Sequence, residues 1–269
     1  MKSIPQWVHL VDRLRAMIRS GAFPDDRLPT EPVLAKDLSA SRGTVRRALA
    51  QLEHEGLIIR KHGSGTYINP AVLTINTRMD EVWDFSEMIR LAGYEPGVQH
   101  IETRLEPASP EYGDKLNLDA AAEVIAVANL FLADRRPVIY CLDVIPGHLV
   151  RQAYAPEELY GPVYTFLYRR CHQQVSYNIA EVCAVNADEI LSGLLKCPLG
   201  TALHDFEEIG YNAENEPIIF SQEYYLPDVF CFQAVRRMMS TPGESAYSSA
   251  NPGGLLASRI LPNQEKENP

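Results

Sequence analysis

The sequence lacks several features that would place it in a common class of protein. Its 269 residues contain no apolar run near the ~20 residues that a membrane helix needs, and its N-terminus does not have the pattern of a signal peptide. The seven histidines form no HxH or HExxH pattern. We also find no GxSxG motif, phosphate-binding loop or nucleophile–base pair. We therefore expect no membrane span, metal site, cofactor or catalytic residue.

The cysteines show no spacing that is typical of a metal site or a disulfide framework. The five cysteines are odd in number, lie scattered along the chain and form no CxxC pair. Such usage is typical of thiols that stay reduced and mostly buried, so we expect a cytoplasmic protein.

Charge is unevenly distributed. The chain has a formal net charge of −10, which by itself argues against a nucleic-acid partner. Residues 1–70, however, hold 11 Lys and Arg against 7 Asp and Glu, whereas the remainder holds 14 against 28. A mildly basic head on a strongly acidic body would keep DNA on one side of the molecule.

The stretch from residue 28 to 68 is the most informative part of the chain. Its second helical pattern carries an apolar stripe with i, i+3, i+4, i+7 spacing, made of Val45, Ala48, Leu49 and Leu52. Ser41 stands where an N-cap hydroxyl is expected and Gly56 where the helix should stop.

The first turn of this helix predicts a DNA-reading surface. Arg42 and Arg46 are four residues apart on one face, with Gly43, Thr44 and Arg47 beside them. A helix N-terminus favours phosphate, Arg can bridge guanine O6 and N7, and Gly allows close approach in the major groove. The alternative is an ordinary amphipathic helix with a solvated basic face.

The flanking segments favour the DNA-reading interpretation. Upstream, Thr30 can cap a helix through Val33, Leu34 and Leu38, and only residues 39–41 join the two helices. Downstream, residues 57–60 and 66–68 are strand-like, and the turn between them contains His62 and Gly63. This tip can lie against DNA, or it is only a hairpin turn that needs Gly at positive φ.

The segment FPDDRLPTEPVLAKDLSASRGTVRRALAQLEHEGLIIRKHGSGTYI resembles the DNA-binding domain of the GntR family of bacterial transcription regulators. The resemblance runs from about residue 7 to 69. It implies a winged helix-turn-helix in which five residues contact DNA: Arg42, Thr44, Arg46, His62 and Gly63. The sequence departs from the family at Pro32, where members often carry a DNA-contacting Arg.

The rest of the chain predicts an α+β domain built on an antiparallel sheet. A first helix is expected at residues 5–20 and an interdomain linker at 71–80. Further helices are expected at residues 82–92, 110–116, 148–153, 163–171 and 187–195. Strands are expected at residues 98–104, 123–132, 138–145, 176–184, 202–211 and 217–226.

This second half resembles the UTRA ligand-binding domain, which marks the HutC subfamily of GntR regulators and shares its fold with chorismate lyase. The similarity lies in FSEMIRLAG, LADRRPV, LLKCPLGTAL and EYYLPDVFCF. We expect a DNA-binding domain at 1–70, a linker at 71–80, a UTRA domain at 81–239 and a disordered tail at 240–269 rich in Ser, Pro, Gly and Asn.

Strand alternation predicts one ligand-facing side of the sheet. The residues that we expect to bind an effector are Ser86, Asn129, Phe131, Cys141, Asp143, Glu223 and Tyr225. Relatives that bind sugar phosphates often have Arg at the positions of Asn129 and Phe131, and Ser86 at a helix start retains the family character. We therefore expect an effector that is neutral or cationic, partly flat, and not a sugar phosphate. The alternative is that Asn129, Asp143 and Glu223 are structural and the pocket lies elsewhere.

The sequence thus predicts a ligand-responsive, DNA-binding transcriptional regulator. We expect a cytoplasmic homodimeric repressor whose partners are a double-stranded operator and a small-molecule effector. Two alternatives are an enzyme similar to chorismate lyase with a DNA-binding head, and an architectural DNA-binding protein without an effector.

Overall fold

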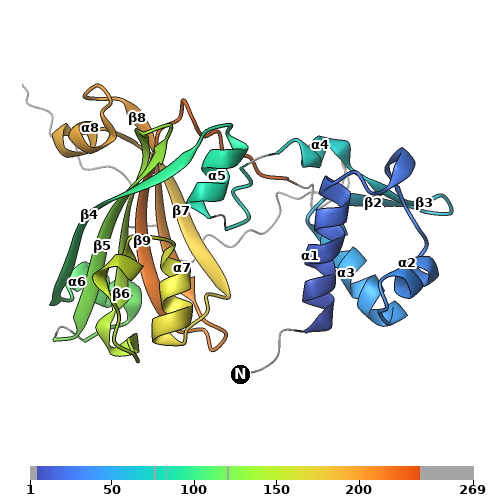
Figure 1. Ribbon diagram of the computed structural model, residues 1–269, viewed down its shortest axis with the longest axis horizontal. Coiled ribbons are helices and arrows are strands. Elements are labelled where there is room, and N and C mark those ends of the chain that lie inside the picture. The colour runs from blue at the N-terminus through green and yellow to red at the C-terminus, as the bar shows by residue number, and fades with distance from the viewer. Residues whose placement is uncertain (1–4, 76, 83, 120, 237–269) are drawn as a thin grey trace, which may run out of the picture. The chain divides into compact units, whose positions relative to one another are not determined.

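The structure is a computed structural model that describes residues 5–75, 77–82, 84–119 and 121–236 (Figure 1). The N-terminal domain contains α1 (Gln6–Arg19), α2 (Glu31–Asp37) and α3 (Arg42–His54). Its three-stranded antiparallel sheet has the order β1-β3-β2, formed by β1 (Arg27–Leu28), β2 (Ile58–Lys61) and β3 (Gly65–Ile68). The two helices of the predicted motif and the hairpin wing are therefore confirmed.

The core of this domain lies between α1 and α3. The predicted stripe of α3 is buried throughout, and α1 contributes the buried residues Leu10, Val11, Leu14 and Ile18. The Ser41 hydroxyl accepts a hydrogen bond from the Thr44 backbone N–H at 3.1 Å, as expected for an N-cap. Gly56 has a φ of 80° directly after the helix, a conformation that favours glycine.

Three details differ from the sequence expectation. The Thr30 side chain makes no capping hydrogen bond at the start of α2, although its backbone is extended as a cap requires. Val33 is 46 % exposed and faces solvent rather than the core. Strand β1 follows a short 3-10 turn, η1 (Pro24–Asp26), and neither was expected because two residues are too few to show alternation.

The C-terminal domain is built on a six-stranded antiparallel sheet with the order β4-β5-β6-β9-β8-β7. Its strands are β4 (Pro96–Pro107), β5 (Glu123–Ala133), β6 (Arg136–Pro146), β7 (Tyr177–Asn186), β8 (Ala202–Tyr211) and β9 (Pro217–Tyr225). The final strand in sequence therefore lies between β6 and β8. The α+β prediction is confirmed.

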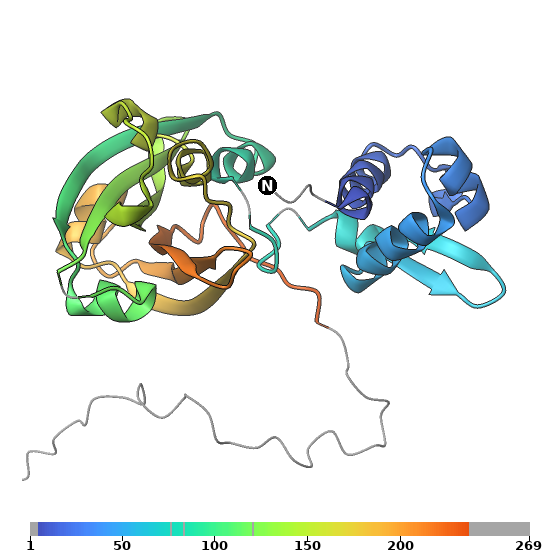
Figure 2. The same cartoon turned by 90° about the horizontal axis from the view of Figure 1, so that it is seen from below.

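Helices cover both faces of this sheet (Figures 1 and 2). On one face α6 (Pro110–Leu116) packs its buried Leu116 against Val124 and Phe220, and α8 (Glu189–Leu195) packs Leu195 near Leu203. On the other face lie α5 (Phe85–Leu91) and α7 (Val163–Phe166). This second face is where the sequence predicts the ligand.

The connection between β6 and β7 is less helical than predicted. Residues 148–153 do not form an α-helix, because the Arg151 N–H donates to the Arg170 carbonyl instead of to the preceding turn. The connection contains the 3-10 turns η2 (Gly147–Leu149) and η3 (Pro156–Leu159), and α7 continues as a π-helical turn, η4 (Leu167–Cys171).

The segment predicted to be a linker is partly structured. It begins with one helical turn, α4 (Pro70–Leu73). Further along, the Gln233 N–H donates to the Thr77 carbonyl at 2.9 Å, and the Met79 N–H donates to the Gln233 carbonyl at 2.8 Å. The end of the linker is thus bonded to the segment after β9. The predicted tail at 240–269 lies outside the described residues, and no described helix is long and apolar enough to cross a membrane.

Replacing Leu14 with Ala should lower the free energy of unfolding of the N-terminal domain by roughly 2–5 kcal/mol, because Leu14 is fully buried and the cavity can collapse only partly. Chemical denaturation followed by circular dichroism measures the change. Val33→Ala is the matched control and should stay within about 0.5 kcal/mol. Equal losses in both variants would contradict the placement of Val33 at the surface.

Candidate DNA-binding surface and effector cavity

The N-terminal turn of α3 presents a polar surface. Arg42, Gly43, Arg46 and Arg47 are exposed, and Thr44 is half-buried. The Thr44 hydroxyl lies 2.8 Å from the Ser41 hydroxyl, so it takes part in the helix cap. Because the cap satisfies only part of the free N–H groups at a helix end, this surface remains suited to a phosphate.

Arg46 is held by a neighbouring carboxylate. Its Nε and Nη2 atoms lie 3.2 and 3.1 Å from Glu31 Oε2, and Arg60 approaches the same carboxylate at 3.8 Å. Since Arg46 is largely exposed, this pairing costs little to break. Its guanidinium is free to exchange Glu31 for a nucleic-acid acceptor.

The wing carries His62 and Gly63 at an exposed tip. Gly63 has a φ of 71° and Gly65 of 127°, which confirms that the turn needs glycine. Arg27 from β1 donates to the Ser64 carbonyl at 2.9 Å and lies beside the Tyr67 ring. Sequence reasoning did not select Arg27, because the pairing of β1 with β3 is not visible locally.

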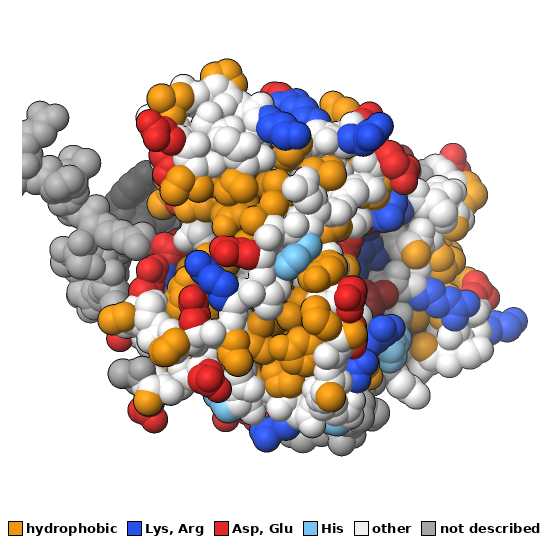
Figure 3. All heavy atoms as spheres, turned by 60° about the vertical axis from the view of Figure 1, so that its left-hand side comes forward, with side chains coloured by type: hydrophobic (Ala, Val, Ile, Leu, Met, Phe, Trp, Pro, Cys, Tyr) orange, Lys and Arg blue, Asp and Glu red, His pale blue; other side chains and the backbone are white. Residues whose placement is uncertain are grey.

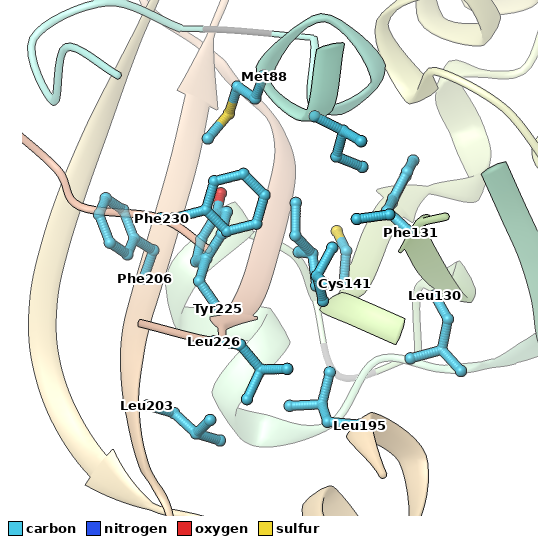
Figure 4. Packing of buried hydrophobic residues seen from close by; sticks show 14 of the residues in the cluster. Met88, Leu130, Phe131, Cys141, Leu195, Leu203, Phe206, Tyr225, Leu226 and Phe230 are labelled. Atoms are coloured by element: carbon cyan, nitrogen blue, oxygen red, sulfur yellow. The ribbon is translucent and has the colours of Figure 1, made fainter. Parts of the chain in front are cut away.

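The C-terminal domain contains a cavity on the face covered by α5 and α7. It has about 710 Å³ of empty space, which includes open solvent. Its aromatic walls are Phe85, Phe131, Tyr164, Phe206, Tyr225 and Phe232. The rings contact one another: Phe85 and Phe131 are 4.4 Å apart at their centroids, and Tyr225 and Phe232 are 4.9 Å apart. Figure 4 shows Met88, Phe131, Phe206 and Tyr225 within this packing.

Carboxylates line the floor of the cavity. They are Asp143 on β6, Glu208 on β8 and Glu223 on β9. The Ser221 hydroxyl donates to Asp143 Oδ1 at 2.6 Å, and the Tyr225 hydroxyl donates to Glu223 Oε2. The floor is therefore polar and acidic, while the walls are apolar.

Burial weakens the acidity of these groups. It raises the pKa of Asp143 to about 6, against the opposing hydrogen bonds from Ser221 and the Cys141 thiol. Burial also raises the pKa of Glu208 and that of Glu223, and the Glu208 charge raises the latter further. Removal of charged carboxylates from water favours the protonated form.

The structure brings four of the seven predicted effector residues into the cavity: Phe131, Asp143, Glu223 and Tyr225. Asn129 shares their face but is buried outside the cavity lining, where its Nδ2 donates to the Leu159 carbonyl at 3.2 Å and its Oδ1 lies 3.0 Å from His100 Nδ1. Cys141 is buried on the same face of β6 as Asp143, and its thiol donates a hydrogen bond to the Asp143 carboxylate. An effector contact by either residue stays a prediction.

Ser86 does not line the cavity either, and the start of α5 is already occupied. The Asp84 side chain accepts a hydrogen bond from the Glu87 N–H at 3.1 Å and caps the helix. A carboxylate therefore lies where an anionic ligand would have to bind the first N–H groups.

Sequence reasoning missed Phe206 and Glu208 on β8. Both follow from the register of the closing hairpin, because Phe206 faces Glu223 and Glu208 faces Ser221. Phe85, Tyr164 and Phe232 come from α5, α7 and the segment after β9, and no local pattern connects them. Within the described ranges, no group of His, Cys, Asp and Glu could hold a metal ion.

A capped helix beside a hairpin wing, followed along the chain by a sheet domain that contains a cavity, is typical of helix-turn-helix transcriptional regulators. Residues 7–68 match the bacterial regulatory proteins of the gntR family, and residues 91–230 match the UTRA domain. The chain belongs to the GntR family and has the HutC-type architecture, with a UTRA domain after the DNA-binding domain.

Two relatives are similar to the chain in sequence, and one solved structure is similar in fold. The chain is 25% identical over 227 residues to the uncharacterized HTH-type transcriptional regulator YurK of Bacillus subtilis, covering 81% of this chain and 90% of YurK. It is 28% identical over 147 residues to the HTH-type transcriptional repressor NagR of the same organism, covering 54% and 60%. The fold is similar to that of the possible transcriptional regulator YydK from Bacillus subtilis, with a TM-score of 0.69, 14% identity and coverage of 87% and 100%.

The raised pKa of Asp143 predicts a pH-dependent stability. Because the folded chain holds this proton more tightly than the unfolded chain, its contribution is complete below about pH 4 and is lost as the pH rises through about 6. Asp143→Asn should therefore gain up to about 3 kcal/mol relative to wild type between pH 4 and pH 7.5. Urea denaturation at both pH values measures this difference.

The exposed Glu214 in the β8–β9 turn provides the control. Glu214→Gln should follow the wild-type pH profile. A parallel profile for Asp143→Asn as well would show that the Asp143 carboxyl ionises normally in the folded chain.

Proposed function

We propose that this protein is a transcriptional repressor that binds an operator as a homodimer and releases it when a small-molecule effector occupies the UTRA cavity. The observation that carries the proposal is the pairing of two surfaces in one chain. The exposed arginines at the start of α3 suit DNA, whereas the cavity between the sheet, α5 and α7 suits a small ligand. The similarity to NagR, which is named a repressor, supports the sign of regulation.

The proposed DNA contacts are Arg42, Gly43, Thr44, Arg46 and Arg47 in the major groove, and His62 and Gly63 at the wing. All but the half-buried Thr44 are exposed. Pro32 has no charged side chain, so it cannot make the DNA contact that an Arg at this position often makes in the family. Arg27 beside the wing is an additional candidate for a phosphate contact.

A homodimer is supported by the outer strand of the sheet. Strand β4 has 12 residues and lies at an edge, where Val98, Ile101 and Leu105 are exposed. Figure 3 looks onto this side of the domain and shows hydrophobic side chains gathered in patches. An exposed edge strand presents unpaired backbone N–H and C=O groups to which a second chain can pair. A two-fold dimer would present two recognition helices to half-sites about one helical turn apart.

Effector binding would act by population shift. A ligand that binds one dimer geometry more tightly than another moves the equilibrium toward it by that difference in affinity. We propose that the favoured geometry no longer matches both half-sites. The protein would act in the cytoplasm, where the chromosome is.

The cavity favours a neutral or cationic, partly flat effector over a sugar phosphate. Phe131 offers a flat wall, and the floor is acidic. The related proteins are named transcriptional regulators, which favours a regulatory role over that of a lyase-like enzyme. We propose that the chain catalyses no reaction.

Selection from fragmented genomic DNA should yield a sequence with two half-sites. Arg42→Ala should then weaken specific binding by about 5- to 160-fold, because one bidentate base contact is worth roughly 1–3 kcal/mol. Fluorescence anisotropy at fixed salt measures the affinity. Arg13→Ala, on the exposed side of α1, is the matched control and should bind as wild type does. Failure to enrich any sequence would contradict the proposed function.

Repression is tested separately from DNA binding. A reporter fused to the selected operator should give higher expression when the regulator gene is deleted, and complementation with the Arg42→Ala variant should leave expression high. Lower expression after deletion would identify an activator instead.

A further inference from the structure

Three carboxylates lie on three neighbouring strands below the aromatic walls of the cavity. In the register of the sheet, Glu208 on β8 faces Ser221 on β9, and Ser221 faces Asp143 on β6. Glu223 lies two residues further along β9 on the same face. Because adjacent strands are ~4.8 Å apart, the carboxylates surround a region of about 10 Å. This is the size of a small polar group and its hydrogen-bond partners.

The carboxylates have only neutral partners. Ser221 donates to Asp143, Tyr225 to Glu223, and Asn178 to Glu208. Over the described part of the chain, no Lys, Arg or His forms an ion pair with any of the three. Glu223 is only 6 % exposed, and the neutral Tyr225 hydroxyl is its side-chain hydrogen-bond partner. A buried carboxylate without a charged partner favours a ligand that supplies one.

Two more carboxylates, Asp84 and Glu81, line the cavity and add negative charge to it. One cationic side chain, Arg78, lines it as well. The Arg78 guanidinium, however, is already bound by Asp80 at 3.0 Å and lies 3.4 Å from Glu81. Tyr164 on α7 is neutral, because burial raises the pKa of its hydroxyl. The lining therefore attracts a cation and repels an anion.

The walls fit the apolar part of the same ligand. Phe85 and Phe131 meet edge to face, as do Phe206 and Tyr225, whose centroids are 5.2 Å apart. Aromatic faces attract cations as well as apolar groups. Carboxylates below and aromatic rings around them form the combination by which proteins bind organic ammonium ions.

We propose that the effector is a small organic cation, with an ammonium or amidinium group between Asp143, Glu208 and Glu223 and an apolar body against the aromatic walls. The inference rests on the proposed function and narrows the class of effector, since a neutral ligand would leave the three buried carboxylates without a charged partner. The inference also assigns a ligand contact to Glu208. This residue lies on β8, which contributes none of the effector-binding residues predicted from the sequence.

Binding of a cation also predicts proton release. Because burial holds the pKa of Glu223 well above its ordinary value, the empty site keeps protons that a bound cation would displace. A neutral ligand would produce no such exchange. Calorimetry in two buffers of different ionisation enthalpy distinguishes the two cases.

The test uses the full-length protein and matched probes at about 10 mM, a concentration at which even weak ligands raise the unfolding temperature. The cations are benzylamine, benzamidine and agmatine. Benzyl alcohol and benzoate are the neutral and anionic counterparts, and glucosamine 6-phosphate is the sugar phosphate. The cations should raise the unfolding temperature and release protons, whereas the other probes should do neither.

Glu223→Gln and Glu208→Gln should each weaken binding of the best cation by at least about tenfold, since each removes a buried opposite charge. Glu214→Gln is the matched control, because Glu214 is exposed in the turn that follows β8. Circular dichroism verifies that the variants fold. Undiminished binding in both cavity variants would overturn the proposal. So would stronger stabilisation by benzyl alcohol, benzoate or the sugar phosphate than by the cations, and so would the absence of stabilisation by any cation.

The same samples separate this inference from the proposed function. DNA affinity is measured with and without each probe that binds. A cation that binds in the cavity but never alters DNA affinity would support the site and contradict effector-controlled release. Release of DNA by an anion would support effector control and overturn the cation site.

Discussion

The antiparallel register of β5, β6, β9 and β8 is the constraint on which the ligand cavity depends. It places Phe131, Asp143, Glu223 and Glu208 on one face, although they come from four separate strands. Because side chains alternate, a slip of one residue in any of these strands would turn its contribution to the opposite face, among the apolar residues under α6. The strand register therefore decides which side chains line the cavity, and so decides the chemistry of the site.

The DNA-binding surface depends on a different and more local interaction. The buried stripe of α3 fixes the helix against α1, and the Ser41 cap fixes where the helix begins. Together they determine which side chains of the first turn reach solvent. Arg46 is not held ready for DNA by this arrangement, because it is paired with Glu31, and the proposed DNA contact would require it to exchange that partner.

These two kinds of dependence explain how much could be predicted from the sequence. The helices and wing of the N-terminal domain follow from apolar spacing and glycine positions within some 40 residues. The prediction failed at Val33 and the Thr30 side chain, and it did not include the short elements η1 and β1. The cavity needs contacts between distant segments. Alternation found Asp143 and Glu223 but could not reveal that Asn129 is held by His100 and the Leu159 carbonyl, since the position of η3 is not encoded in the strand. Glu208 was within reach, because the hairpin register alone places it opposite Ser221.

The segment after β9 contacts the cavity through a side chain and the linker through its backbone. Phe232 contributes its ring to the cavity wall against Tyr225, whereas the backbone of its neighbour Gln233 bonds to Thr77 and Met79, and the Cys231 carbonyl accepts from the Thr77 hydroxyl at 2.6 Å. Under the proposed function, a ligand that displaced the Phe232 ring would also shift the Gln233 peptide group, which is hydrogen-bonded to Thr77 and Met79 in the segment that leads back to the DNA-binding domain.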